Sequence, residues 1–411
     1  MDTLYPRCAG LDVHKETVAA CVRHQGPRGR ARQEVRTFAT HTAGLLELAD
    51  WLAAEGVTHV AMESTGVYWK PVFHVLEGRF ELLLVNAEHV KKVPGRKTDV
   101  KDCQWIAQLL QHGLLRASFV PPAPIRELRD LTRQRAQLVG ERVRVGNRIQ
   151  KVLEDANVKL AGVASDVLGM SGRAMLRAIV AGEADPAKLA ELALGRLREK
   201  IPALRQALAG RVSDHHRFLL GLLLDQLGQL EGLIARLEAR IAEGLAPFAE
   251  EVRRLMTIPG ISRTVAEVVL AEAGPDLAAF PSAAHLASWA GLCPGNNESA
   301  GKQKGGRARK GNRWLRTALV QAAWAAGRAK GTYLQAQFRR LSARRGAKRA
   351  AMAVGHTVLV MVYHVLSRGE PYRELGADYL DKLAPDRLTR NLVKRLERLG
   401  HKVTLEPQDA A

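Results

Sequence analysis

Residues 8–22 read CAGLDVHKETVAACV, and this stretch indicates how the first part of the chain folds. Two runs of β-prone residues, 8–13 and 17–22, are separated by a polar turn, which is typical of a β-hairpin. Further strands are predicted at 57–62 and 80–85, and helices at 45–52 and about 100–110. A hairpin followed by alternating strands and helices predicts an α/β domain with a mixed sheet over residues 1–118.

A helical region is predicted over residues 119–250. Residues 121–124 read PPAP and mark the change, and residues 125–160 are Arg-rich with a helical pattern. Leucine and isoleucine then alternate at intervals of three and four, which is typical of a coiled coil. These residues are Leu220, Leu223, Leu227, Leu230, Ile234, Leu237 and Ile241. The helix could pack within its own chain, but self-association is favoured, because the Arg-rich helix before it offers a polar face.

A third, mainly α-helical region is predicted over residues 251–370. Residues 255–266 read LMTIPGISRTVA, which predicts a helix, a Pro-Gly turn and a second helix, as in a helix-hairpin-helix segment. Two more helices are predicted at 282–290 and 312–328. Residues 371–411 form a charged C-terminal tail.

The charge of the chain points to a polyanionic partner. Its 411 residues carry a net charge of +20, and its pI is about 10.2. From Ser299 to Ser367 there is no Asp or Glu, and the same window holds fifteen Lys and Arg. A surplus of this kind can serve solubility alone, but its concentration in one acid-free window favours nucleic-acid phosphates.

The cysteines and the apolar runs bear on the compartment. Four cysteines lie far apart without a CxxC pair, so neither a disulfide framework nor a zinc site is expected. The N-terminus has no signal-peptide pattern, and the longest apolar run, 350–366, is too short to span a bilayer. We therefore expect a cytoplasmic protein with no membrane partner.

Four acidic residues stand at positions where they can meet. Asp12 and Glu63 end predicted strands, and Asp99 and Asp102 lie three residues apart at a predicted helix start. Each alone could be a turn or capping residue. Together at one sheet edge they would need a hard cation, Mg²⁺ or Mn²⁺. The basic residues beside the last pair, Lys97 and Lys101 among them, suit a nearby phosphate backbone.

Three motifs, LDVHKET, AMESTGVYW and GRKTDVKDCQWIAQLL, resemble the RuvC-like DEDD domain of a family of insertion-sequence transposases. The downstream LMTIPGISRTVAEVVLAE, LASWAGLCPG and ESAGKQKGGRARKGNRWLRTALVQAAW resemble the C-terminal transposase domain of that family. The resemblance implies an RNase H-like N-terminal fold, catalytic and metal-binding roles for the four acids, and a serine nucleophile at Ser299. It also implies a coiled coil for assembly, a tetramer, and a bridge RNA that pairs with target and donor DNA.

Residues 295–306, GNNESAGKQKGG, contain that serine in a glycine-rich basic loop. From these residues alone a structural serine in a phosphate-binding loop is the simpler interpretation; the resemblance assigns it attack on DNA and a covalent phosphoserine. Two positions depart from the family pattern: Ala300 stands where glycine is common, and Ser262 replaces the second glycine of the hairpin turn. The residues expected to contact phosphates here are Lys302, Lys304, Arg307, Arg309, Lys310, Arg313 and Arg316.

Together with this resemblance, the sequence predicts a DNA transposase or recombinase that acts on double-stranded target and donor DNA as a homo-oligomer, dimer or tetramer. The bridge RNA is implied by the resemblance alone. Two alternatives stay open. One is a RuvC-like, structure-specific endonuclease that uses two-metal hydrolysis without a covalent intermediate. The other is a catalytically silent nucleic-acid-binding protein, which the presence of all four acids disfavours.

Overall fold

The computed structural model describes residues 3–26, 31–64, 66–87, 90, 102–294, 297–299, 302–305, 310–383 and 385–406, with the backbone alone at 31, 297–299, 302–305 and 387. The chain divides into two compact units, Met1–Val120 and Pro121–Ala411. Each unit is described by itself below.

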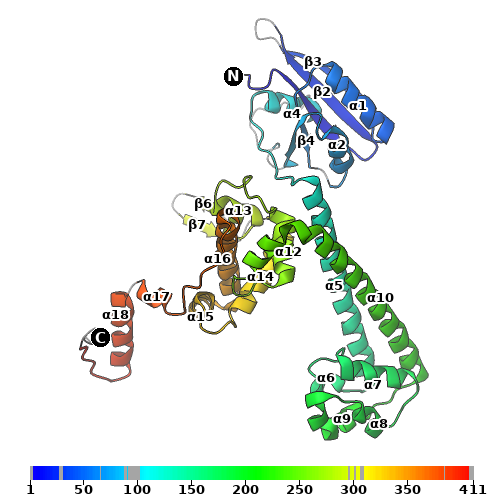
Figure 1. Cartoon of the computed structure of the whole chain (residues 1–411), viewed down its shortest axis with the longest axis vertical. Helices are drawn as coiled ribbons and strands as arrows, with labels where there is room; N and C mark the ends of the chain where they lie inside the picture. The colour runs from blue at the N-terminus through cyan, green and yellow to red at the C-terminus, as the bar shows by residue number, and fades with distance from the viewer. Residues whose placement is uncertain are drawn as a thin grey trace. The chain divides into compact units, whose positions relative to one another are not determined.

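The first unit is built on a five-stranded mixed sheet (Figure 1). Its strands are β1 (Arg7–Val13), β2 (Thr17–Gln25), β3 (Ala31–Ala39), β4 (His59–Glu63) and β5 (Glu81–Val85). The strand order is β3-β2-β1-β4-β5; β1, β2 and β3 pair antiparallel, whereas β1, β4 and β5 pair parallel. This confirms the predicted mixed sheet, which is compatible with an RNase H-like domain. Strand β3 was not predicted, because charged residues interrupt its apolar pattern.

Helices cover both faces of this sheet. The side chains of Ala9 and Leu11 in β1 pack with α1 (Thr42–Ala54) and α2 (Trp69–Leu76). Cys8, the residue before Ala9, packs on the other face, with α4 (Asp102–Gln111). Alternation along β1 therefore assigns each residue of that strand to one of two buried layers.

The second unit begins with two long helices, α5 (Ala123–Asp155) and α10 (Asp214–Leu245). They run antiparallel: Leu128 lies close to Gly244, and Asp155 contacts His216 at 3.0 Å. Figure 1 shows the small helices of residues 160–208 gathered at one end of the pair. These are α6 (Leu160–Val163), α7 (Met170–Val180), α8 (Pro186–Glu191), the 3-10 helix Gly195–Lys200 and α9 (Ile201–Leu208).

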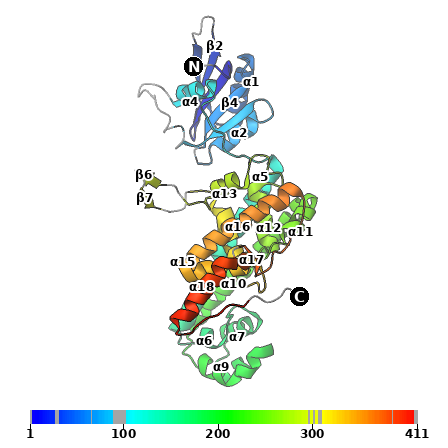
Figure 2. The ribbon, with the colours of Figure 1, turned by 90° about the vertical axis from the view of Figure 1, so that its left-hand side faces the viewer.

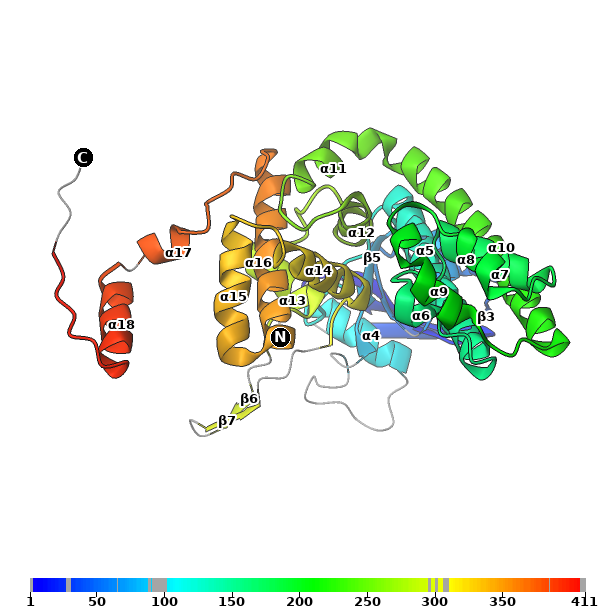
Figure 3. The ribbon, with the colours of Figure 1, turned by 90° about the horizontal axis from the view of Figure 1, so that it is seen from below.

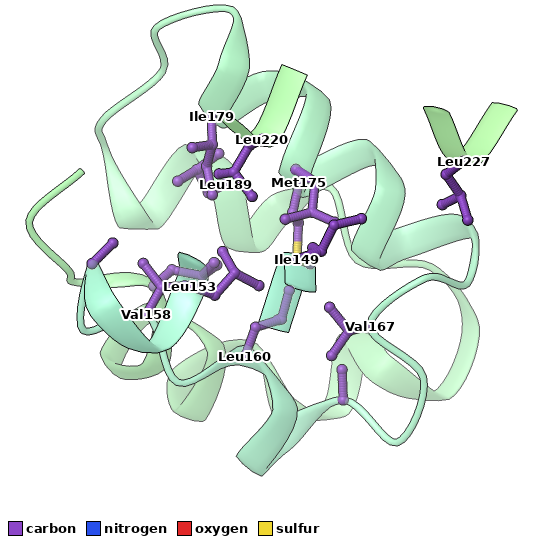
Figure 4. Close-up of a cluster of buried hydrophobic side chains, with 14 of the residues drawn as sticks. Ile149, Leu153, Val158, Leu160, Val167, Met175, Ile179, Leu189, Leu220 and Leu227 are labelled. Atoms are coloured by element: carbon purple, nitrogen blue, oxygen red, sulfur yellow. The ribbon is translucent and has the colours of Figure 1, made fainter. Parts of the chain in front are cut away.

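The expectation that the Arg-rich helix offers α10 only a polar face is wrong. Helix α5 buries a row of apolar residues, including Leu138, Val145 and Ile149, in one core with Leu220 and Leu227 of α10. Figure 4 shows Ile149, Leu220 and Leu227 together with side chains of the small helices. The arginines and the apolar residues of α5 alternate at helical spacing, so its basic composition hides an apolar stripe. The heptad pattern of α10 is therefore satisfied within one chain.

Among the helices after α10, α16 (Ala347–Arg368) packs on α13 (Ala283–Ala290), α14 (Arg313–Ala326) and α15 (Tyr333–Arg345). Figures 2 and 3 show α15 and α16 side by side. The other elements are the 3-10 helix Ala246–Phe248, α11 (Ala249–Leu255), α12 (Arg263–Ala273), β6 (Asn297–Ser299), β7 (Lys302–Gly305), α17 (Tyr379–Lys382) and α18 (Pro385–Arg398).

Two helices, Asp214–Leu255 and Ala347–Arg368, are long and apolar enough to cross a membrane by length and composition. The second is longer than the apolar run that the sequence indicated. Its residues Ala350, Val354 and Val358 are buried within the unit, and core helices of globular proteins commonly pass the same test. This is weak support for a membrane span.

Candidate active site and nucleic-acid interface

Asp12 and Glu63 lie at corresponding positions on two neighbouring parallel strands. The register between β1 and β4 pairs Gly10 with Ala61 and Leu11 with Met62, and the next residue on each strand is the acid. Because side chains alternate along a strand, Asp12 shares the face of Cys8, and Glu63 shares the face of Ala61. Both of these faces are the one covered by α4. The structure therefore brings the two acids to one edge and one face of the sheet.

Helix α4 brings Asp102 to the same end of β1. The Leu4 amide donates to the Gln111 carbonyl at 2.9 Å, and the Cys8 thiol donates to the Ala107 carbonyl at 3.6 Å. Further along β1, Gly10 lies beside the Cys103 carbonyl. The helix thus runs antiparallel to the strand, and its first turn lies over the end of β1 that carries Asp12.

Gly10 makes this approach possible. A Cβ atom added to Gly10 would lie 2.3 Å from the Ala107 nitrogen and 2.4 Å from the Cys103 carbonyl oxygen. Both are backbone atoms of a helix, so no side-chain rotation would relieve the overlap. The glycine of the AGLD motif is therefore explained by close packing of α4 on the sheet.

The donor chemistry of this edge suits a hard divalent cation, since it consists of carboxylate oxygens. Among the described residues, however, no group of three or more His, Cys, Asp or Glu is assembled at metal-binding spacing. Asp99, the fourth predicted acid, and the neighbouring Lys97 and Lys101 lie outside the described residues.

His14 joins this edge and was missed by sequence reasoning. Its Nε2 atom lies 3.2 Å from Oδ2 of Asp12, whose side chain is 22% exposed. The histidine follows the acid by two residues, so both point to the same side of the chain. This spacing, in the motif LDVHKET, is the signal in the sequence that points to His14.

In the second unit, Ser299 lies in a short antiparallel hairpin. It is the last residue of β6 and pairs in register with Lys302, the first residue of β7. Lys304 also lies in β7. The predicted loop is thus a two-stranded ribbon over part of its length, while Arg307 and Arg309 fall outside the described residues.

The other predicted phosphate contacts lie at or near the start of α14. Lys310 and Arg313 are exposed and Arg316 is half-buried. Asn312 caps this helix: its side-chain oxygen accepts hydrogen bonds from the amides of Trp314 at 3.0 Å and Leu315 at 3.1 Å. The cap fixes the direction in which the chain leaves the basic segment.

A buried ion-pair network, which no sequence pattern predicted, lies behind this cap. Glu272 of α12 is fully buried and accepts two hydrogen bonds from Arg133 of α5, at 2.7 and 2.8 Å. The Asn312 side-chain amide donates to the same carboxylate at 2.6 Å. Burial also lowers the pKa of Arg129, which donates to the Glu272 carbonyl, to about 10. Hydrogen bonds to Glu272 of α12 thus connect that helix both to α5 and to the cap of α14.

Trp314 is half-buried and Trp324 is 39% exposed, so neither is a core residue. The Arg313 guanidinium lies 4.5 Å from the centroid of the Trp314 ring, and the Arg133 guanidinium lies 5.8 Å from it. Trp324 packs against Phe338.

Packing and helix capping explain the residues of the glycine turn before α12. Gly260 has φ of +92°, and a Cβ there would lie 2.3 Å from the Ala322 carbonyl oxygen of α14. Ser262 caps α12, its hydroxyl accepting from the Val265 amide. The close contact with α14 and the helix cap account for both residues.

Comparison with known proteins places this architecture in a class. Residues 9–158 match a family model of DEDD transposases, and residues 252–339 match one described as "Transposase IS116/IS110/IS902 family". A transposase for insertion sequence element IS1111A from Coxiella burnetii (strain RSA 493 / Nine Mile phase I) is 25% identical over 299 residues, which cover 71% of this chain and 72% of the relative.

The two matches define the chain as an enzyme, a transposase with an acidic α/β domain and a helical second unit. It belongs to the IS110 family of insertion-sequence transposases.

Proposed function

We propose that this transposase cuts and rejoins double-stranded DNA with two groups of residues. The first is the acidic set Asp12, Glu63, Asp99 and Asp102 of an RNase H-like (RuvC-like) domain. The second is Ser299 as nucleophile. The observation that carries the proposal is the convergence of Asp12, Glu63 and the start of α4 on one sheet edge.

The four acids would hold Mg²⁺ or Mn²⁺. Carboxylates that share one edge repel one another unless a cation neutralises them, and oxygen donors are the ligands that these ions prefer. A bound divalent cation supplies charge stabilisation to oxygens of the reacting phosphate. His14, through its contact with Asp12, would orient that carboxylate.

Ser299 would attack a DNA phosphorus atom through its hydroxyl oxygen. A serine–phosphate bond forms and the bond from phosphorus to one deoxyribose oxygen breaks; the serine proton passes to a base, and the released oxygen takes up a proton. Attack by a second deoxyribose hydroxyl reverses the exchange and joins the new strands. The number of phosphoester bonds is conserved, so no nucleotide hydrolysis is needed. The acids, from the same or another protomer, are the candidates for the base.

The basic segment would bind the nucleic acid. Lys302, Lys304 and Lys310, together with Arg313 and Arg316, lie on the hairpin and the following helix start, within an acid-free window. Arg307, Arg309, Lys97 and Lys101 extend the proposed set. The family resemblance supports guidance by a bridge RNA, assembly as a dimer or tetramer, and a cytoplasmic location.

The acidic site is tested on a plasmid that carries the insertion sequence and its flanks. Asp12→Asn and Asp102→Asn should each lower the yield of strand-exchange products by more than about tenfold, and chelation of divalent ions should do the same. Asp50→Asn is the matched control, because Asp50 is 73% exposed and pairs only at the surface with Arg79. Full activity of Asp12→Asn would rule out the metal site.

The serine is tested by trapping a covalent adduct. Labelled DNA should stay attached to the denatured protein in a stalled reaction, and Ser299→Ala should abolish both adduct and exchange. Ser288→Ala, an exposed serine on α13, should keep both. Cleavage that survives Ser299→Ala without exchange would instead indicate a metal-dependent endonuclease.

The RNA partner is tested by sequencing the nucleic acid that co-purifies with the chain. RNase treatment should abolish strand exchange. Adding the RNA of the element back, after the RNase is removed, should restore it. Exchange that is insensitive to RNase would exclude RNA guidance while leaving the two catalytic proposals standing.

A further inference from the structure

A cavity of about 330 Å³ lies between α5, α12 and α14 of the second unit. Its walls combine apolar side chains, such as Val139, Val265 and Val268, with the guanidinium groups of Arg133, Arg135 and Arg313. The volume falls in the range of small-ligand sites and is sufficient for one nucleotide, but not for a duplex. None of these lining residues belongs to the acidic edge or to the hairpin with Ser299.

Positive charge dominates this cavity. Three arginines but only one acid, Glu272, are among the described residues that line it. Glu272 is shared by Arg133 and Arg129, and Glu267 behind the wall is shared by Arg135 and Arg263. Each carboxylate therefore serves two guanidiniums. A half-enclosed cationic surplus of this kind is stabilised by an anionic ligand.

Arg135 contributes positive charge to the wall of the cavity. Its side chain is 6% exposed, and its Nη1 atom donates to Oε2 of Glu267 at 2.5 Å. Its Nη2 atom has no partner among the described residues, but protein atoms cover it, so it is not open to a ligand.

Trp314 also lines the cavity, with two guanidiniums over its ring; Arg313, the nearer one, is exposed. Thr317 and Gln321, on the same helix, line the cavity from its exposed side. Apolar walls together with an exposed guanidinium match a base and its phosphate.

We propose that this cavity binds a single unpaired nucleotide of the nucleic acid on which the transposase acts. The base lies among the valines beside Trp314, and the guanidinium of Arg313 contacts the phosphate. The proposal rests on the proposed nucleic-acid function. Strand exchange exposes unpaired nucleotides, so such a site would hold a displaced base during the reaction.

A second copy of the chain is the competing occupant. A protein side chain would satisfy the apolar walls, but an acidic one would be needed for the three arginines. A nucleotide carries both a phosphate for the arginines and a base for the apolar walls, whereas no single protein side chain carries both. The charge of the cavity therefore favours a nucleotide.

The test compares two short DNA duplexes of one sequence, one fully paired and one with a single unpaired nucleotide. Fluorescence anisotropy with the full-length chain should show roughly tenfold tighter binding of the second duplex, as burial of one base against apolar walls provides. Thr317→Trp and Gln321→Trp fill the cavity from exposed positions and should bring the affinity ratio to about one. Ala325→Trp places the same side chain at an exposed position of α14 that does not line the cavity, and should keep the ratio.

Thermal unfolding shows whether the tryptophan variants fold. If one of the two filling variants does not fold, the other still tests the cavity. An affinity ratio near one for the natural chain overturns this inference while leaving the proposed function intact. A ratio that persists in both filling variants also overturns it. Loss of self-association in Thr317→Trp with an unchanged ratio would assign the cavity to a second copy. Failure of either duplex to bind would contradict the proposed DNA function itself.

Discussion

Arg133 donates two parallel hydrogen bonds to the fully buried carboxylate of Glu272, Nε to Oε1 at 2.7 Å and Nη2 to Oε2 at 2.8 Å. The pair joins α5 to α12, and the amide of Asn312 ties the same carboxylate to the start of α14. The long helical pair and the helix that follows the basic hairpin thus share one buried charge. The direction of α14 depends on it.

Glu272→Gln should destabilise the second unit strongly. The amide leaves the guanidiniums of Arg133 and Arg129 without a counter-charge, which typically costs about 3–5 kcal/mol for a buried pair. The thermal midpoint of unfolding should fall by more than about 5 °C. Glu243→Gln is the control: its carboxylate is 65% exposed and contacts Arg240, so it should cost less than about 1 kcal/mol. Equal midpoints for the two variants would contradict the buried network.

Much of the first unit was predictable, because its strands and helices carry strong local patterns. The runs 8–13, 17–22, 57–62 and 80–85 became β1, β2, β4 and β5. Strand β3 was not predicted, because charged residues interrupt its apolar pattern at an edge of the sheet. The parallel pairing that aligns Asp12 with Glu63 is a long-range contact, which no local pattern specifies.

The second unit shows where sequence patterns fail. The heptads of α10 predict a partner helix but cannot identify it, and the arginines of α5 conceal the apolar stripe that α10 contacts. Likewise, Glu272 and Arg135 look like ordinary surface residues of amphipathic helices. Their burial follows from the packing of α12 and α14 on α5, which the spacing of residues within each helix does not determine.

Gly10→Ala should damage the acidic edge without touching an acid. The added Cβ would meet backbone atoms of Cys103 and Ala107, so α4 must shift and carry Asp102 with it. Overpacking of this kind costs about 1–3 kcal/mol, and strand exchange should fall by more than about tenfold.

Gly232→Ala is the matched control for this change. Gly232 lies within α10, and a Cβ there meets nothing within 4 Å. Alanine in a helix interior should keep activity and raise stability by up to about 1 kcal/mol. Exchange by Gly10→Ala at the natural rate would show that α4 does not position the acidic edge.

Leu227→Ala should lower stability more than Leu222→Ala, because the two residues lie on different faces of α10. Leu227 is 1% exposed in the core shared with α5, whereas Leu222 is 53% exposed on the same helix. Truncation of the buried residue should cost about 2–5 kcal/mol of unfolding free energy, and Leu222→Ala less than about 1 kcal/mol. Urea unfolding measures the stability of both variants. A larger loss for Leu222→Ala would mean that the exposed face is the one covered in solution.

The cysteines provide a test of burial in the first unit. Burial raises the pKa of the Cys8 and Cys21 thiols to about 12 in each case, and the nearby Arg23 lowers both slightly. Alkylation requires the thiolate, so at about pH 8 these two thiols stay protonated as well as shielded. Cys293, in the second unit, is half-buried and accessible to reagent.

Iodoacetamide should therefore label the native chain at Cys293 before Cys8 or Cys21, and unfolding in urea should expose all four cysteines. Peptide mass spectrometry identifies the labelled sites. Raising the pH by one unit should leave Cys8 and Cys21 unlabelled, because their pKa values still lie well above it. Cys293→Ser removes the accessible thiol and serves as the control. Labelling of Cys8 as rapid as that of Cys293 would show that α4 does not cover β1 in solution.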